Sequence, residues 1–171
     1  DFSELMNQEL KKMWANKLGL EHYHETIIND FFNLMLISKA DYTILFRKLS
    51  DIPDNIVPLK ESFYLPINEE LKNKWEVWIQ NWQSILKKEA NIKEKSASMK
   101  SINPVYTWRE WTVVPAYEEA EKGNYSKIKE LQAIFSNPYK KQPSEIDQKF
   151  NRLKPRQYFN YGGVSHCSCS S

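Results

Sequence analysis

The most reactive side chains in this sequence stand near its end, where His166, Cys167 and Cys169 bring an imidazole and two thiols within four positions. A protonated imidazole lowers the pKa of a neighbouring thiol, and the thiolate is the form that undergoes oxidation. The cluster therefore predicts a redox-active sulfur. A structural zinc site is tetrahedral, so these three ligands would need one more from elsewhere. A solvated pair of thiols without a role is the third interpretation that the sequence leaves open.

The number and position of the cysteines also indicate the redox state of the cellular compartment. The sequence has two cysteines, and both lie within its last five residues. Such a pair cannot cross-link a framework of disulfides, which is how small secreted domains compensate for a small core. A reducing compartment is therefore expected.

The rest of the sequence carries few signs of catalysis. It has no glycine-rich phosphate loop, no nucleophile elbow and no pair of zinc-binding histidines around a glutamate. His22 and His24 are two positions apart, and such residues point to different faces of a helix, so they are poor joint metal ligands. We therefore assign no catalytic, cofactor-binding or metal-binding residue to this chain.

Three tryptophans, Trp75, Trp78 and Trp82, follow the spacing of one helical face. Exposed beside a basic groove, such a row could stack on bases or sugars. Buried, it would supply a large apolar surface to a helical core. Packing between helices is the interpretation we favour, because the 24 basic and 22 acidic side chains are interspersed and leave a formal net charge of only +2.

Helical periodicity dominates the first hundred residues. The expected helices are one that Gly19 ends, one that begins at Glu21, a short one within residues 39–50, and a long one from its N-cap Asn68 to about Glu89. Residues 51–66 contain three prolines among scattered apolar residues, which predicts a long irregular connection packed by its own side chains. The lysine-rich segment 87–100 is expected to be helical and solvated.

A helical hairpin is expected in residues 103–135. Asn103 and Pro104 are typical of a cap followed by the first helical residue, and Val105, Trp108 and Trp111 would then share the buried face. Gly123 is placed to end this helix, and Asn124 to cap a second one with Ile128, Leu131, Ile134 and Phe135 on its apolar side. Pro115 interrupts the first helix, so a kink or a break is expected there.

These patterns predict an all-α fold, an irregular helical bundle with a long Pro-containing connection and an extended C-terminal tail. We expect a helical region at residues 1–139 and the tail at 140–171. No apolar run approaches the roughly 18 residues that span a bilayer, and the balanced charge attracts neither nucleic acid nor a membrane surface. The sequence begins at Asp1 directly in a helical pattern, so we expect it to be part of a longer protein.

Several short motifs carry a more specific signal, because they follow one another in an order seen in one family. They are Lys17-Leu18-Gly19-Leu20, Ala40-Asp41-Tyr42-Thr43, Phe46-Arg47-Lys48-Leu49-Ser50, Ser101-Ile102-Asn103-Pro104 with Arg109, Ala120-Glu121-Lys122-Gly123, Asn137-Pro138-Tyr139 and Cys169-Ser170-Ser171. In this order, across nearly the whole chain, the sequence resembles the C-terminal region of the selenoprotein O family, in a cysteine-containing member.

The resemblance implies a parent protein with a kinase-like core, which binds ATP with Mg²⁺ and transfers AMP to Ser, Thr or Tyr hydroxyls of protein substrates. The nucleotide- and metal-binding residues of that family lie in the core, so none is carried onto this chain, whose expected partner is that core within the same polypeptide. Cys169 matches the position that holds selenocysteine or cysteine in the family, and this sequence adds Cys167. Whether Cys169 pairs with Cys167 or with a cysteine of the core stays open.

The resemblance also implies a mitochondrial protein if the source is eukaryotic, and a cytoplasmic one otherwise. Two functions from other classes remain as alternatives. One is a stand-alone helical protein-interaction module without catalysis, whose tryptophan-rich surface docks a partner. The other is a thiol oxidoreductase that uses Cys167 and Cys169.

Overall fold

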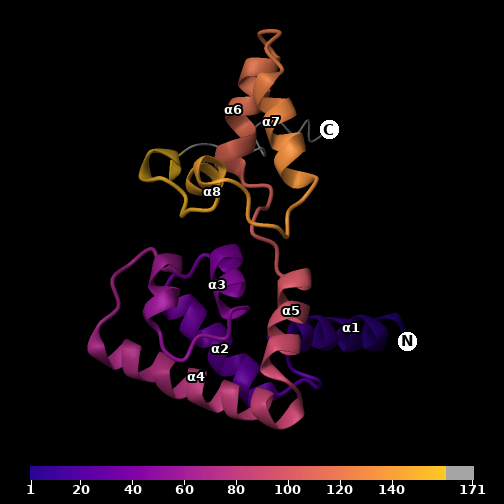
Figure 1. Cartoon of the computed structure of the whole chain (residues 1–171), viewed down its shortest axis with the longest axis vertical. Coiled ribbons are helices and arrows are strands. Elements are labelled where there is room, and N and C mark those ends of the chain that lie inside the picture. The colour runs from indigo at the N-terminus through magenta and orange to yellow at the C-terminus, as the bar shows by residue number, and fades with distance from the viewer. Residues whose placement is uncertain (161–171) are drawn as a thin grey trace. The chain divides into compact units, whose positions relative to one another are not determined.

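Helices are the only extended regular elements in residues 1–160, the part of the chain that the computed structural model describes (Figure 1). The all-α prediction is confirmed. In order they are α1 (Phe2–Lys17), α2 (Glu25–Ile37), α3 (Tyr42–Leu49), the 3₁₀ turn η1 (Val57–Ser62), α4 (Glu69–Glu89), α5 (Ile92–Ile102), α6 (Glu110–Ala120), α7 (Ser126–Phe135), α8 (Ser144–Phe150) and η2 (Arg156–Tyr158). They form two compact units, Asp1–Pro104 and the part from Val105 onward, which we describe one at a time.

Side-chain caps set several helix starts in the first unit. The Asn68 side chain accepts a hydrogen bond from the backbone N–H of Leu71 at 2.8 Å, so the predicted cap of α4 is confirmed. Asp41 caps α3 in the same way, through the N–H of Ile44 at 3.0 Å. The second helix begins at Glu25 rather than Glu21, so His22 and His24 precede it and the prediction of a helix there is wrong.

Helix α4 carries the core of the first unit. Trp75, Trp78 and Trp82 are at most 3% exposed, so their predicted burial is confirmed. The rings of Trp78 and Trp82 stack with their centroids 5.4 Å apart, and Phe31 of α2 stacks on Trp78 at 5.0 Å. The core therefore forms where one face of α4 meets α2.

The connection at residues 51–66 is irregular, as predicted, apart from the turn η1. Its apolar residues Ile56 and Leu59 are completely buried, and Phe63 packs against Trp75 with ring centroids 5.5 Å apart. The backbone carbonyl of Pro53 accepts a hydrogen bond from the side chain of Gln83 in α4 at 2.8 Å. The connection is thus a packed part of the first unit.

The prediction of a solvated helix at residues 87–100 is wrong in part. Helix α5 begins at Ile92, and its Lys95 and Met99 are buried. Gly19 has a positive φ of 71°, and a Cβ built on it would lie 2.8 Å from the sulfur of Met99. Glycine is therefore favoured at this position by the backbone conformation, and a Cβ would also make the flexible side chain of Met99 shift.

Asn103 does not start a helix, contrary to the prediction; it is the residue at which α5 ends. Its side-chain oxygen accepts a hydrogen bond from Lys17 Nζ at 2.9 Å, and its amide donates to the carbonyl of Lys17 at 2.8 Å and to the Ser50 hydroxyl at 3.1 Å. The side chain is fully buried. It joins the ends of α1, α3 and α5, so it is not available to start a helix.

The first helix of the second unit begins at Glu110, later than predicted. The backbone N–H groups of Val105 and Tyr106 donate to the carbonyl of Pro138 at 2.8 and 3.2 Å, which holds this stretch outside a helix. The shared buried face expected for Val105, Trp108 and Trp111 does not form, because Trp108 is 66% exposed. Its ring stacks on Phe135 instead, at 4.7 Å.

The predicted hairpin of α6 and α7 is present in the second unit. Gly123 has a φ of 84° in the turn, and the Asn124 side chain accepts a hydrogen bond from the backbone N–H of Ser126 at 3.1 Å. Helix α6 continues through Pro115, so the break that was one of the two expected outcomes does not occur. Pro115 lies in the middle of the helix, and its missing N–H deprives the carbonyl of Trp111 of its helical donor.

The tail predicted at residues 140–171 is not extended throughout. Residues Ser144–Phe150 form α8, and Phe150 is buried in a cluster with Leu131 and Ile134. Ile146, four positions before Phe150, packs on the same cluster, so this short helix is formed by tertiary packing rather than by a strong local pattern. His166, Cys167 and Cys169 lie outside the described residues.

We predict that Asn103→Ala lowers the free energy of unfolding of the chain by about 1–3 kcal/mol, because it leaves the buried Lys17 amine without its acceptor. Denaturation by urea, followed by tryptophan fluorescence, measures the change. Ser98→Ala, an exposed substitution on the same helix α5, is the control and should stay within about 0.5 kcal/mol of the unsubstituted chain. Equal stability of the two variants would show that the Asn103 bonds do not hold α1 to α5.

Candidate functional site

The side chains that the sequence favoured for chemistry do not form a site in the described residues. The redox candidates Cys167 and Cys169 lie beyond residue 160. Stacking of bases on Trp75, Trp78 and Trp82 is contradicted by their burial, and each indole N–H is already bound within the first unit. Within residues 1–160, no three His, Cys, Asp or Glu side chains are grouped so that they could hold a metal ion.

The most conspicuous surface of the first unit is an apolar face on α1. Five large apolar residues project from it into solvent, and we call them the α1 stripe: Phe2, Leu5, Met6, Leu10 and Met13. Phe2 is 77% exposed and Leu10 44%. Apart from the adjacent pair Leu5 and Met6, they follow one another at steps of three or four positions, which places them on one side of the helix, and Glu9 lies among them.

Figure 1 shows the N-terminal part of α1 projecting beyond the other helices of the first unit, which leaves the stripe uncovered. The C-terminal part of α1 is packed, since the ring of Trp14 contacts Phe32 of α2 and Phe46 of α3. Leu5 and Met13 share the sequence pattern of Trp14 and Leu18, but the structure separates them: Leu18 is fully buried and Leu5 is 57% exposed. The helical periodicity of the sequence indicates an apolar face, but it does not show which part of that face is covered by other residues of the fold.

The buried end of α1 is fixed by Lys17. Its amine donates to Asn103 and lies over the rings of Phe46 and Tyr42, 4.8 and 5.2 Å from their centroids. Burial lowers the pKa of Lys17 and raises that of Tyr42. These contacts fix the direction in which α1 leaves the first unit.

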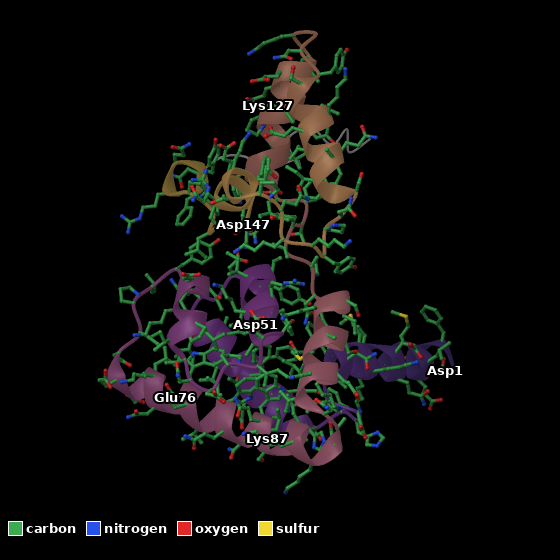
Figure 2. All side chains as sticks on the ribbon, viewed as in Figure 1. Asp1, Asp51, Glu76, Lys87, Lys127 and Asp147 are labelled. Carbon is green, nitrogen blue, oxygen red and sulfur yellow. The ribbon has the colours of Figure 1, made fainter. Side chains whose placement is uncertain are left out.

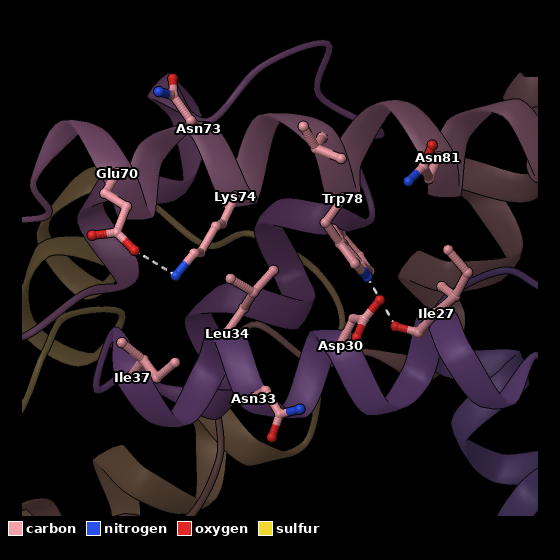
Figure 3. A pocket seen from close by; sticks show the side chains of 11 residues that line it. Ile27, Asp30, Asn33, Leu34, Ile37, Glu70, Asn73, Lys74, Trp78 and Asn81 are labelled. Atoms are coloured by element: carbon pink, nitrogen blue, oxygen red, sulfur yellow. Dashed lines mark hydrogen bonds and ion pairs between the residues drawn. The ribbon is translucent and has the colours of Figure 1, made fainter.

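A second surface is a groove of about 510 Å³ between α2 and α4. Figure 3 shows Leu34 and Ile37 of α2 facing Lys74 and Trp78 of α4 across it. Its apolar lining also includes Ile27 and Val77, and its polar rim consists of Asp30, Asn33, Glu70, Asn73, Lys74 and Asn81.

Charge at the rim of this groove is slightly negative. Lys74 donates to Glu70 at 2.6 Å, and this hydrogen bond together with the charge of Lys74 holds the pKa of Glu70 below its usual value. Asp30 has no such cation beside it in the described residues. A groove with an apolar floor and an acidic rim is suited to an amphipathic helix with a basic edge.

The described helices include none with the length and apolar character needed to cross a membrane.

Comparison with known proteins identifies the class. The chain matches the family described as protein adenylyltransferase SelO over residues 1–136. It is 30% identical to a protein nucleotidyltransferase YdiU of Tolumonas auensis over 99% of its own length, and 30% identical to the YdiU of Flavobacterium johnsoniae over 95%. The YdiU of Vibrio atlanticus is 29% identical over 97% of the chain.

This chain belongs to the protein adenylyltransferase SelO family, because the match covers most of its residues. It spans about a third of the length of these curated relatives, 34% for the protein of Tolumonas auensis and 33% for that of Flavobacterium johnsoniae. The resemblance in the short motifs is thus confirmed at the level of the family.

We predict that Leu10→Lys changes the free energy of unfolding of the chain by less than about 0.5 kcal/mol, because Leu10 projects into solvent. Leu18→Ala, at the buried end of the same helical segment, should cost about 2–5 kcal/mol. Urea denaturation of both variants makes the comparison. A large loss of stability in Leu10→Lys would mean that the stripe is part of the core of this chain.

Proposed function

We propose that this chain is the helical C-terminal portion of a kinase-like protein adenylyltransferase, a protein that transfers AMP from ATP to Ser, Thr or Tyr hydroxyls of proteins. The observation that carries the proposal is the family match along residues 1–136 in a chain that spans only a third of its relatives. The work of this portion is structural: it packs on the rest of the polypeptide and supports it.

ATP and Mg²⁺ belong, in this proposal, to the kinase-like core of the longer protein. The described residues do not fit a Mg²⁺ site, because their carboxylates form no cluster of three or more with other ligating groups. We therefore assign no step of AMP transfer to a residue of this chain. The protein substrates would likewise meet the core.

The α1 stripe is the surface that we assign to the contact with the core. Five apolar side chains on one face of a projecting helix are the kind of surface that protein interfaces bury. Relatives of this chain are about three times as long, so a large part of such a protein is available to cover it. The bonds of Lys17 and Asn103 hold α1 in place for that contact.

A redox role for the end of the chain is a further part of the proposal. Cys169, with Cys167 as a possible resolving thiol, would respond to oxidation and thereby regulate the parent enzyme. We place the protein in mitochondria if its source is eukaryotic and in the cytoplasm otherwise, as the family resemblance implies.

The alternative is a helical protein-interaction module without catalysis. The groove between α2 and α4 is the observation in its favour, since its apolar floor and the carboxylate of Asp30 match a partner helix with a basic edge. In this alternative α4 and α2 form the working surface, and the α1 stripe has no assigned role.

Transfer of labelled AMP tests the proposal. The full open reading frame that contains this chain should label a generic protein substrate when given ATP labelled at the α-phosphate, and the 171-residue chain alone should not. Labelling by the isolated chain would refute this division of labour, and transfer of the γ-phosphate instead of AMP would refute the reaction.

The docking surface is tested separately in the full-length protein. We expect Leu10→Lys to lower AMP transfer about tenfold or more, because loss of the apolar contact costs at least ~1.4 kcal/mol. Val77→Lys, a change at another exposed apolar residue that lines the α2–α4 groove, is the matched control and should leave transfer unchanged. The reverse result, with Val77→Lys impaired and Leu10→Lys active, would contradict the assignment of the core contact to the α1 stripe and would assign it to the α2–α4 groove.

A further inference from the structure

A small cavity of about 120 Å³ lies within the second unit, where α6, α7, α8 and the turn η2 meet. Three cationic side chains line it: Lys127 from α7, Lys149 from α8, and Arg152 just after α8. Trp111 of α6 and Tyr158 of η2 contribute aromatic walls, with ring centroids 6.1 Å apart. Figure 2 draws the side chains of these elements and labels Lys127.

Two of the three cations have carboxylate partners. Lys127 pairs with Glu119 at 2.7 Å, and Lys149 donates to both oxygens of Glu130 at 2.6 and 2.8 Å. Each lysine carries three N–H donors, so both keep donors to spare after these contacts. The hydrogen bond to Glu119 raises the pKa of Lys127, which keeps it protonated at neutral pH.

Arg152 is the one of these three cations that has no carboxylate partner within residues 1–160. Within residues 1–160 its only recorded contact is with the ring of Trp111, 5.4 Å from the centroid. A guanidinium that lies over an indole ring makes no hydrogen bond to it through its edge, so its N–H groups stay available to an acceptor. With Lys127 and Lys149 neutralised by Glu119 and Glu130, the cavity has a net charge of about +1.

Trp111 supplies an independent sign that an acceptor is missing. Its side chain is 7% exposed, and its indole Nε1–H is buried without a hydrogen-bond partner among the described residues. A buried donor left unpaired costs about 1–3 kcal/mol, and buried tryptophans usually find a partner. The three tryptophans of α4 all do so.

We infer that this cavity binds a phosphate group, with Arg152 as its main cation and the indole of Trp111 and the spare donors of Lys127 and Lys149 completing the site. A phosphate has more acceptor oxygens than a carboxylate and spreads them over a tetrahedron, which suits donors that come from three helices and from the stretch after α8. The cavity has room for one such group and not for a nucleoside. The inference does not depend on the proposed function.

Titration of the 171-residue chain with sodium phosphate tests the inference. The readout is the nitrogen–proton NMR signal of the Trp111 indole, assigned by through-bond connectivity. Sodium chloride at matched ionic strength gives the baseline shift. Sodium acetate tests whether a carboxylate binds as well as phosphate does. A parallel titration with O-phosphoserine shows whether the cavity accepts an esterified phosphate as well as a free one.

The expected result is a saturable shift of the Trp111 signal with phosphate, with phosphoserine, or with both, and affinity for acetate at least about fivefold weaker. Arg152→Gln should weaken phosphate binding about tenfold, because it removes the unpaired charge, whereas Lys140→Gln, outside the cavity, should not. A shift no larger than that caused by chloride, equal affinity for acetate, or unchanged binding by Arg152→Gln would each overturn the inference.

Discussion

The first unit depends on three hydrogen bonds from one face of α4. Trp75 donates its indole N–H to the Ser38 hydroxyl at 2.8 Å, Trp78 to the carbonyl of Ile27 at 2.9 Å, and Trp82 to the carbonyl of Leu18 at 2.8 Å. The acceptors lie at the C-terminal end of α2, within α2, and just after α1. A single helix thus sets the positions of its neighbours with directional bonds as well as apolar burial.

This arrangement explains how α1 can project without being loose. Its last turn is held by Trp82 through Leu18 and by Asn103 through Lys17, while its first turns carry apolar residues into solvent. A helix fixed at one end and apolar at the other keeps its exposed face in a defined orientation. Such pre-organisation lowers the entropic cost of binding a partner.

The sequence was sufficient to predict the features that depend on local patterns. The long helix from Asn68, the α6–α7 hairpin at Gly123 and the burial of the tryptophans all follow from spacing and caps. It was insufficient where a residue has a distant partner. Asn103 has the local signature of a helix cap, but its bonds go to Lys17, 86 positions away, and α8 forms because Phe150 packs on α7.

Prediction of the candidate surfaces from the sequence is limited in the same way. Leu5 and Leu18 fit one helical pattern, and only the tertiary structure reveals that the first is exposed and the second buried. The cationic cavity joins residues from 111 to 158, and no motif connects Trp111 to Arg152 in the sequence. The pairing of Lys127 and Lys149 with glutamates, which singles out Arg152, is likewise a property of the fold.

Photo-crosslinking from the α1 stripe in the full-length protein tests the central claim most directly. A photoreactive phenylalanine analogue placed at Leu10 should form crosslinks that mass spectrometry assigns to peptides of the proposed kinase-like core. The same analogue at Val77 should not. If the analogue at position 10 gives no crosslink to any peptide of the core, the account is contradicted.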